Sequence, residues 1–332
     1  MRSIIIAEAG VNHNGSLKKA LKMVDVAASA KADFIKFQTF IPSELCQKNF
    51  RLAHYQKKNT KAKSQFEMLK SLSLSFREFK IIKNRCKKKK IGFMSTPFDE
   101  ASLKFLNKIN VKFIKIASGE VTNVPLIQEI GKLKKKIILS SGMCNLKEIK
   151  KTLKILYSQG TKKKNITVLH CNTEYPATVE KLNLMSIKYI KDKLKMKVGF
   201  SDHSLGKEAS LIALAFGASV LEKHFTLDKK LKGPDQKTSL DPNELHEYID
   251  TIRKYEKSLG GYYKKPYGAE KKNINVIRKH IVAKKQIKKG DFFNKKNITT
   301  KRAKKGIAAY KWNLIIGKKS NYNFKIDDNI KV

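Results

Sequence analysis

Apolar and polar positions along this chain alternate between short strand-like runs and longer helical ones. Eight short apolar segments predict buried strands, and they cover residues 3–9, 34–39, 91–96, 112–117, 136–140, 166–171, 198–201 and 220–224. Segments with helical spacing separate them, as in Lys207 to Phe216, which Gly217 is placed to end. Eight strands alternating with helices over about 260 residues predict an α/β fold of the (β/α)8 TIM-barrel type.

A doubly wound open sheet is the alternative to this barrel. Such sheets normally contain fewer strands, and the chain has no GxGxxG motif of the dinucleotide-binding form. Polar residues gather at the carboxyl ends of the predicted strands, where a barrel brings them to one active-site face. A long polar insertion, residues 40–73, follows the second strand, and one helix is expected near residues 64–70.

The alternation of apolar strands and helices stops after Gly260-Gly261, so we expect the chain to have three parts. These are a barrel domain at 1–260, a linker at 261–273 and a small unit at 274–332. The small unit contains short apolar runs, HIVA, FFNKKNITT and LIIGKKS, which predict strands separated by Lys-Gly and Asn-Lys turns. It is too short to hold an enzyme site alone, so we expect it to support oligomerisation or to cover the barrel mouth.

Two histidines end consecutive predicted strands. If the strands of His203 and His224 are parallel neighbours, as in most strand–helix–strand units, the two imidazoles share one rim. Two such rings can hold one divalent metal, with Asp202 and Glu222 beside them. A single histidine in a strand is more often structural, but two at matching strand ends, each next to an acid, favour a metal-binding or catalytic role.

Two lysines lie in strands that are otherwise largely apolar, Lys36 and Lys115. A buried ammonium group needs an anion. Hydroxyl groups at neighbouring strand ends would complete a phosphate or carboxylate cradle; they belong to Ser95, Thr96, Ser118, Ser140 and Ser201. Two alternatives stay open: each lysine pairs with a barrel acid such as Glu8 or Glu120, or one forms a Schiff base as in class I aldolases.

The charge balance is strongly basic, with 72 Lys and Arg against 28 Asp and Glu and a net charge of +44. This could indicate a nucleic-acid partner. The basic residues are mostly Lys and spread along the whole chain, without Arg clusters interleaved with aromatic residues. A solvated Lys-rich surface is therefore favoured, and a basic nucleic-acid-binding protein stays as the hypothesis from another class.

Other features predict a cytoplasmic protein. No apolar run approaches the ~20 residues of a membrane span, and the N-terminal apolar run is too short for a signal peptide. The four cysteines are scattered with no CxxC pair, which is typical of reduced thiols.

Several segments in order along nearly the whole chain resemble the sialic acid synthase family, the N-acetylneuraminate synthases. They are IAEAGVNHNGS, KFQTF, FMSTPFD, KIASGE, ILSSGM, LHCNTEYP, GFSDHSLG, LEKHFTLDKKLKGPDQKTSLDP and IVAKKQIKKGD. The resemblance implies a (β/α)8 barrel followed by a C-terminal antifreeze-like (SAF) domain, usually in a domain-swapped homodimer. It also implies a transferase that condenses phosphoenolpyruvate with an open-chain N-acetylated mannose-type sugar. The products would be a nine-carbon 2-keto acid and phosphate, formed by C–O cleavage.

The resemblance also implies roles for individual residues. His203 and His224 would bind a divalent metal, Mn2+ by preference, with Mg2+ and Co2+ as alternatives. Phosphoenolpyruvate would be held by Lys36, Thr96, Lys115, Ser118, Ser140 and Ser201. The sugar would meet Gln38, Tyr175, Glu222 and Asp235, with Arg302 reaching in from the partner's SAF domain. Glu222 would transfer a proton or orient water, while Lys36 and Lys115 would stabilise the charge leaving with phosphate.

Two departures from the family pattern concern the acceptor. Arg302 is followed by Ala303 to Gly306, AKKG, where the family usually has PGNG or PGxG. Asn172 and Thr173 stand in the reverse of the common order, so neither is assigned a role. We expect N-acetylmannosamine as the acceptor, with a 2,4-diacetamido-2,4,6-trideoxyhexose of the legionaminic or pseudaminic type as the alternative. The stretch GPDQKTSL resembles the sialic or legionaminic branch more than the pseudaminic one.

Overall fold

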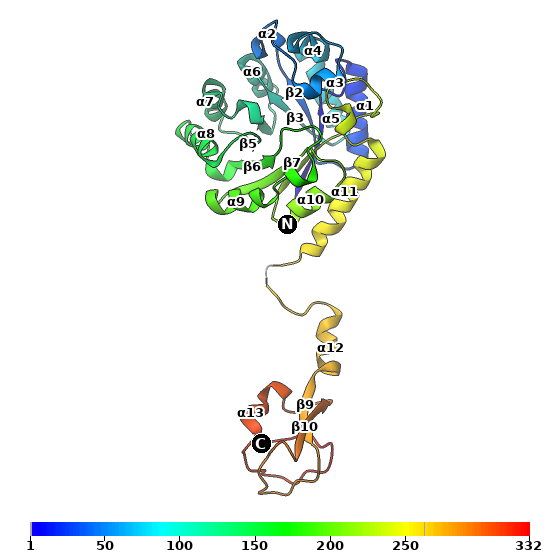
Figure 1. The fold of residues 1–332 in the computed structure, drawn as a ribbon, viewed down its shortest axis with the longest axis vertical. Helices are drawn as coiled ribbons and strands as arrows, with labels where there is room; N and C mark the ends of the chain where they lie inside the picture. The colour runs from blue at the N-terminus through cyan, green and yellow to red at the C-terminus, as the bar shows by residue number, and fades with distance from the viewer. Residues whose placement is uncertain (1, 262) are drawn as a thin grey trace. The chain divides into compact units, whose positions relative to one another are not determined.

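The computed structural model describes residues 2–261 and 263–332 of the chain. Met1 and Tyr262, which fall in the expected barrel domain and linker, lie outside these residues. The chain forms two compact units, Met1–Leu259 and Gly260–Val332 (Figure 1). Each unit has its own hydrophobic core.

The first unit is built on eight parallel strands. They are β1 (Ile4–Gly10), β2 (Phe34–Thr39), β3 (Gly92–Pro97), β4 (Phe113–Ile116), β5 (Lys136–Ser140), β6 (Ile166–Cys171), β7 (Lys197–Asp202) and β8 (Val220–His224). The order is β3-β2-β1-β8-β7-β6-β5-β4, so β1 pairs with both β2 and β8. The strands at the two ends of this order, β3 and β4, lie in contact. The sheet is therefore an almost closed barrel, which excludes the doubly wound alternative.

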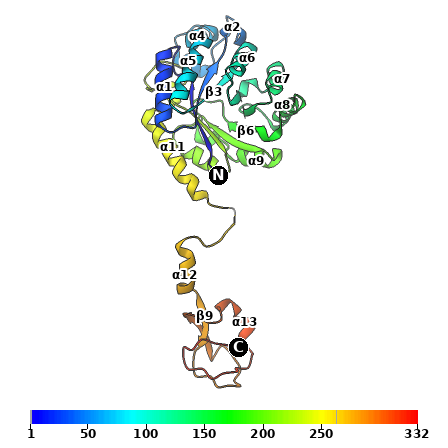
Figure 2. The same ribbon diagram turned by 180° about the vertical axis from the view of Figure 1, so that it is seen from behind.

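Helices surround these strands, as both views show (Figures 1 and 2). They are α1 (Leu17–Ser29), α5 (Phe76–Lys88), α6 (Glu100–Lys108), α7 (Val124–Lys132), α8 (Leu146–Ser158), α9 (Met185–Leu194), α10 (Glu208–Ala215) and α11 (Pro242–Glu256). Ser16 caps α1 by accepting a hydrogen bond from the Lys19 amide. Gly217 follows α10 with φ +88°, a left-handed conformation that suits glycine and ends the helix as predicted.

The insertion after β2 contains three short helices, α2 (Pro42–Leu45), α3 (His54–Asn59) and α4 (Gln65–Leu72). Only α4 was expected from the sequence. In both views α2 and α4 lie at the opposite end of the strands from the N-terminus (Figures 1 and 2). The insertion packs with Val11, which follows β1, in a small apolar cluster formed by Val11, Phe40, Leu52, Met68, Leu69 and Leu72. It thus adds a packed wall at the carboxyl ends of the strands.

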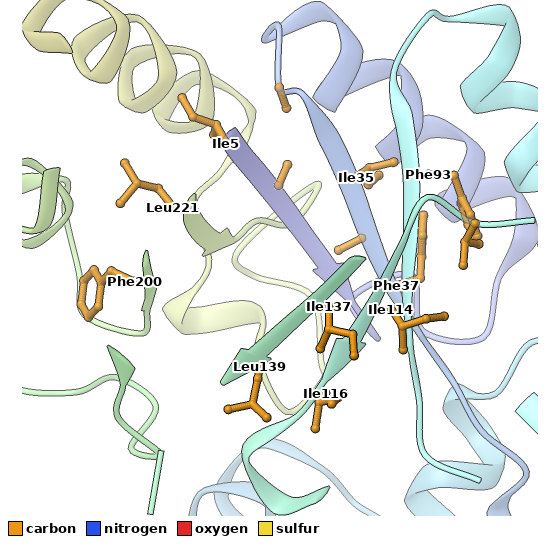
Figure 3. Close-up of a cluster of buried hydrophobic side chains, with 14 of the residues drawn as sticks. Ile5, Ile35, Phe37, Phe93, Ile114, Ile116, Ile137, Leu139, Phe200 and Leu221 are labelled. Atoms are coloured by element: carbon orange, nitrogen blue, oxygen red, sulfur yellow. The ribbon is translucent and has the colours of Figure 1, made fainter. Parts of the chain in front are cut away.

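Alternation along the strands divides the core into two parts. Outward side chains such as Ile35, Phe37, Ile114 and Leu139 belong to the large cluster shared with the helices (Figure 3). Inside the barrel a second apolar layer contains Ile6, Phe34, Met94, Phe113, Ile138, Leu169 and Val220. This layer fills the interior of the barrel. The next inward-facing positions lie two residues further along each strand, towards its carboxyl end.

The second unit contains α12 (Ala269–Ile277), the antiparallel strands β9 (Lys279–Ala283) and β10 (Ile298–Arg302), and α13 (Trp312–Ile315). Residues 269–273, expected in a linker, begin α12, where the Glu270 carboxylate accepts from the Tyr267 amide. The strand predicted for LIIGKKS is wrong, because Leu314 and Ile315 close α13 and Gly317 turns the chain with φ +82°. Of FFNKKNITT only the end is a strand, since Asn297 accepts from the Asn294 amide and makes a turn before Ile298.

No helix among the described residues is long and apolar enough to cross a membrane.

Candidate active site

A polar layer crosses the barrel two residues beyond the inner apolar layer, with one side chain from each strand. Its members are Glu8, Lys36, Thr96, Lys115, Ser140, Cys171, Ser201 and Glu222, and all are less than a tenth exposed. Six of them were predicted to bind substrate or to act in catalysis. Of the other two, Glu8 was expected as a possible partner of a lysine, and Cys171 was not assigned to the site. The same alternation that places Lys36 and Glu222 inward could have identified Cys171.

Four charged side chains of this layer form one buried quartet. The Lys36 ammonium contacts Glu8 and lies 3.8 Å from Glu222 Oε2. The Lys115 ammonium lies 3.3 Å from Glu222 Oε1. Glu222 therefore stands between both lysines, and the quartet brings two ammonium groups together with two carboxyl groups. The sequence hypothesis that barrel acids pair with the lysines is confirmed for Glu8. The second acid that pairs with them is Glu222, and not Glu120.

The two carboxylates of the quartet have different environments. Burial raises the pKa of Glu8, and the nearby Glu222 carboxylate adds to this, although Lys36 opposes it. Burial alone would also raise the pKa of Glu222, but the ammonium groups of Lys115 and Lys36 lower it below its usual value. Glu222 is thus the carboxylate held in its charged form, while Glu8 is the one that more readily carries a proton.

The two lysines also differ. Burial lowers the pKa of Lys115, and Glu222 only partly compensates. Burial acts on Lys36 in the same way, but the Glu222 and Glu8 carboxylates outweigh it and raise the pKa of Lys36. Each lysine donates to a predicted phosphoenolpyruvate-binding hydroxyl: Lys36 to Thr96 Oγ1 at 3.2 Å and Lys115 to Ser140 Oγ at 2.7 Å.

Hydroxyl and thiol groups extend the layer on both sides of the quartet. Ser201 Oγ donates to Glu222 Oε1 at 2.9 Å. Ser118 lies just after β4, and its Oγ is 3.2 Å from the Cys171 sulfur. The Gly142 amide donates to both, at 3.0 Å to Ser118 Oγ and 3.1 Å to Cys171 Sγ. The structure therefore orients Ser118 through Cys171 and Gly142, a link that the sequence did not predict.

The two predicted metal ligands face one another, with ring centroids of His203 and His224 5.4 Å apart. His203 Nδ1 donates to the Asn172 carbonyl at 2.5 Å, which leaves Nε2 with a lone pair. His224 Nδ1 is buried and has no hydrogen-bond partner in the described structure. Burial lowers the pKa of His203 to about 4 and that of His224 well below its usual range. Both rings are therefore neutral near pH 7 and able to bind a metal ion.

These donors fit a divalent ion that takes two imidazoles. No group of three or more His, Cys, Asp or Glu in the described part of the chain could hold a metal. An ion at His203 and His224 would therefore complete its coordination with water and substrate oxygens, as open catalytic sites do.

A second buried ion pair lies behind the histidines. Asp202 and Lys223, each next to a histidine, are partners across β7 and β8, with 2.9 Å between Lys223 Nζ and Asp202 Oδ2. Asp202 also accepts from the Ser204 hydroxyl at 2.6 Å and the Ser210 hydroxyl at 2.7 Å. Asp202 thus packs away from the rim and connects the two histidine-bearing strands, although the sequence suggested a place beside the metal.

The residues predicted to bind the sugar gather beside the histidines. Gln38, Tyr175 and Asp235 line one cavity together with His224. The Tyr175 ring centroid lies 4.3 Å from that of His203. Burial raises the pKa of Asp235 to about 6. Arg302 is the exception, because it lies exposed on β10 in the second unit.

A near-closed parallel barrel with its polar side chains at the carboxyl ends of the strands defines an enzyme of the TIM-barrel class. Its centre combines a buried pair of lysines with two neutral imidazoles. The NeuB family model matches residues 23–264, and the chain belongs to this family. It is therefore a phosphoenolpyruvate-dependent sugar acid synthase, a transferase.

Individual relatives cover nearly the whole chain. N,N'-diacetyllegionaminic acid synthase of Campylobacter jejuni is 47% identical over 99% of both chains. The enzyme of the same name from Legionella pneumophila is 39% identical over 97% of this chain and 92% of its own. The crystal structure of N-acetylneuraminic acid synthetase from Leptospira borgpetersenii, in complex with citrate, matches with a TM-score of 0.73. It shares 35% identity over 82% of this chain and 90% of its own.

Proposed function

We propose that this enzyme condenses phosphoenolpyruvate with 2,4-diacetamido-2,4,6-trideoxymannose to give N,N'-diacetyllegionaminic acid and phosphate. The observation that supports this acceptor is the 47% identity, over 99% of the chain, to a synthase of that name. N-acetylmannosamine, the acceptor that the sequence alone favoured, becomes the second candidate. The similarity to an N-acetylneuraminic acid synthetase of known structure supports this second candidate.

Phosphoenolpyruvate binding is assigned to the lysines and hydroxyls of the polar layer. Lys36 and Lys115 supply the positive charge, and their present partners Thr96 and Ser140 offer hydroxyl hydrogens to phosphate or carboxylate oxygens. Ser118 and Ser201 stand on either side of this pair. Because the lysines are buried, their charge acts on the leaving phosphate with little screening by water.

His203 and His224 would hold the divalent ion, for which we propose Mn2+, with Mg2+ and Co2+ as alternatives. When bound, such an ion polarises an aldehyde oxygen as a Lewis acid. The protein's part is to keep both rings neutral and to fix the direction of His203 through its hydrogen bond to the Asn172 carbonyl.

Glu222 is the proposed group for proton transfer or water orientation. It is charged, accepts from Ser201 and stands between the two lysines. In the reaction, the electron pair of the C2=C3 double bond of phosphoenolpyruvate forms the new bond from C3 to the sugar aldehyde carbon, and the aldehyde oxygen takes up a proton to become a hydroxyl. Water adds to C2, and the resulting tetrahedral centre loses phosphate by C–O cleavage. A carboxylate at this place accepts the proton from the water that adds to C2.

We also propose that the second unit is a SAF domain and that Arg302 completes the sugar site of a partner subunit in a homodimer. The ordered motifs of the chain support this, as does the separate core of the unit.

The proposed reaction is tested by mass spectrometry of the product formed from phosphoenolpyruvate and each sugar with Mn2+. We expect a nine-carbon diacetamido 2-keto acid, no product in EDTA and none with His203→Ala. Phosphoenolpyruvate labelled with 18O at the bridging oxygen should release labelled phosphate. A borohydride-trapped adduct on Lys115, or turnover that survives EDTA, would contradict the proposal.

A further inference from the structure

A cavity of about 110 Å³ opens beside His224, between the barrel rim and the insertion. One wall is apolar and is formed by Val11, Met68, Leu69, Leu72 and Pro234. Val11 and the three residues of α4 are less than a tenth exposed. They belong to the packed cluster of the insertion, so this wall is part of a core and not a loose surface.

The rest of the lining is polar. Gln38 from β2, Tyr175, His224 and Asp235 belong to the active site described above, and Gln56 of α3 adds one polar side chain from the insertion. The Tyr175 and His224 ring centroids are 5.9 Å apart. The cavity therefore joins the proposed metal-binding imidazole to an apolar wall supplied by the insertion.

The insertion is tied to the loop that carries Asp235. The Asn59 side chain donates to the Pro234 carbonyl at 3.1 Å, from α3 to the segment after β8. Pro234 itself lines the cavity. Asn59 of the insertion thus holds the backbone of Pro234, the residue before Asp235, and connects the insertion to this part of the cavity lining.

Resting on the proposed function, we propose that this cavity binds carbons 4 to 6 of the acceptor sugar. Met68, Leu69 and Leu72 then select an acetamido-bearing, 6-deoxy chain over a hydroxylated one. With the aldehyde end at His224, the far end of an open-chain sugar enters the cavity. The two candidate acceptors differ there, since one has methyl-terminated groups at C4 and C6 where the other has hydroxyls. A hydroxyl against this wall would lose its hydrogen bonds to water without replacement.

The cavity has room for one part of this occupant, the acetamido group at C4. Its volume of about 110 Å³ is several times what one water molecule needs. An acetamido group has a polar amide and an apolar methyl carbon, so it suits a cavity lined by both polar and apolar side chains.

Met68→Gln tests this directly, because glutamine has nearly the length of methionine but turns the wall polar. The matched control is Leu52→Ala, in the same apolar cluster but away from the cavity lining. The kcat/KM is measured for N-acetylmannosamine, its 6-deoxy derivative and the 2,4-diacetamido sugar. We expect Met68→Gln to reduce the preference for the diacetamido sugar over N-acetylmannosamine about tenfold or more. The KM for phosphoenolpyruvate should stay unchanged, and Leu52→Ala should keep the wild-type ratio.

Leu69→Phe provides a second test if Met68→Gln fails to fold, as judged by circular dichroism. It narrows the cavity and should lower kcat/KM for the diacetamido sugar more than for N-acetylmannosamine. Wild-type sugar preference in both folded variants would refute the role of the cavity while leaving the proposed function intact. A wild-type enzyme that uses N-acetylmannosamine alone would refute the proposed acceptor and this selection together.

Discussion

At the scale of single residues, Gly142 shows how closely the proposed phosphoenolpyruvate site is packed. A Cβ at this position would lie 2.9 Å from Ser118 Oγ and 3.0 Å from Cys171 Sγ. The same glycine donates its amide hydrogen to both atoms. Any larger residue must therefore displace the hydroxyl that we assign to phosphoenolpyruvate. Gly119, next to Ser118, offers a matched comparison, because a Cβ there would meet no atom of the described residues within 4 Å.

We expect Gly142→Ala to raise the KM for phosphoenolpyruvate about tenfold or more, since a displacement of about 1 Å can cost that much in a positioned site. Gly119→Ala should leave this KM near the wild-type value. Steady-state kinetics at saturating sugar measure both. Equal KM values for the two variants would show that Ser118 does not contact this substrate.

His13 is a residue at which pH should act on stability. It is buried, and burial lowers its pKa from 6.5 to about 4. The unfolded chain therefore binds this proton at a higher pH than the folded one, so stability is lost as the pH falls from about 6.5 towards 4. At pH 4 the loss from this one group is about 3 kcal/mol.

Denaturant unfolding between pH 7 and pH 4 tests this effect. His13→Gln should make stability fall less steeply than in the wild type, because the variant lacks the group that protonates on unfolding. His246→Gln, half-buried on α11, is the control and should follow the wild-type curve. Parallel curves for wild type and His13→Gln would contradict the assignment.

At the scale of elements, the two histidines lie at the carboxyl ends of β7 and β8, His203 directly after β7 and His224 as the last residue of β8, and a buried ion pair connects the two strands. Asp202 and Lys223 are both almost fully buried and connect the strands side by side. Tyr248 on α11 donates to Ser210, which in turn donates to Asp202. The pair therefore fixes the distance between the strand ends from which His203 and His224 project.

Lys223→Met leaves the Asp202 carboxylate buried without its partner, so we expect it to lower the free energy of unfolding by about 3–5 kcal/mol. The double variant Asp202→Asn/Lys223→Met should recover part of this loss. Lys207→Met, which removes a solvent-accessible ion pair with Glu247, should have a much smaller effect. Urea unfolding measures all three, and equal effects for Lys223→Met and Lys207→Met would refute a structural role of the buried pair.

Most elements of the barrel follow from the sequence, because each strand is a short apolar run with a clear end. β2, β5, β6 and β8 have the predicted bounds. Helices α2 and α3 could not be predicted, since each is less than two turns long and depends on tertiary packing. The sequence also could not predict which carboxylate of the quartet pairs with which lysine, because this depends on tertiary structure. Alternation places Lys36 and Glu8 inside the barrel, but only the register between strands decides which carboxylate each lysine meets.

At the scale of the whole molecule, the chain consists of two units with separate cores, and the proposed Arg302 function depends on a second chain. In a domain-swapped dimer, each site takes His203 from one subunit and Arg302 from the partner. Mixing two inactive variants then assembles one complete site in each mixed dimer.

Co-refolding His203→Ala with Arg302→Ala should therefore restore roughly a quarter of the wild-type activity, the share expected from random pairing of two chains. Each variant refolded alone is the control and should stay inactive. No recovery from a mixture that forms dimers would show that Arg302 does not act across subunits.

The central claim is the identity of the two substrates, and the most direct measurement is a side-by-side comparison of acceptors. Phosphate release from phosphoenolpyruvate is followed with Mn2+ and either sugar, and kcat/KM is determined for each. The account predicts sugar-dependent release, abolished by EDTA, with the larger kcat/KM for 2,4-diacetamido-2,4,6-trideoxymannose. A larger kcat/KM for N-acetylmannosamine, or release that does not depend on either sugar, would contradict it.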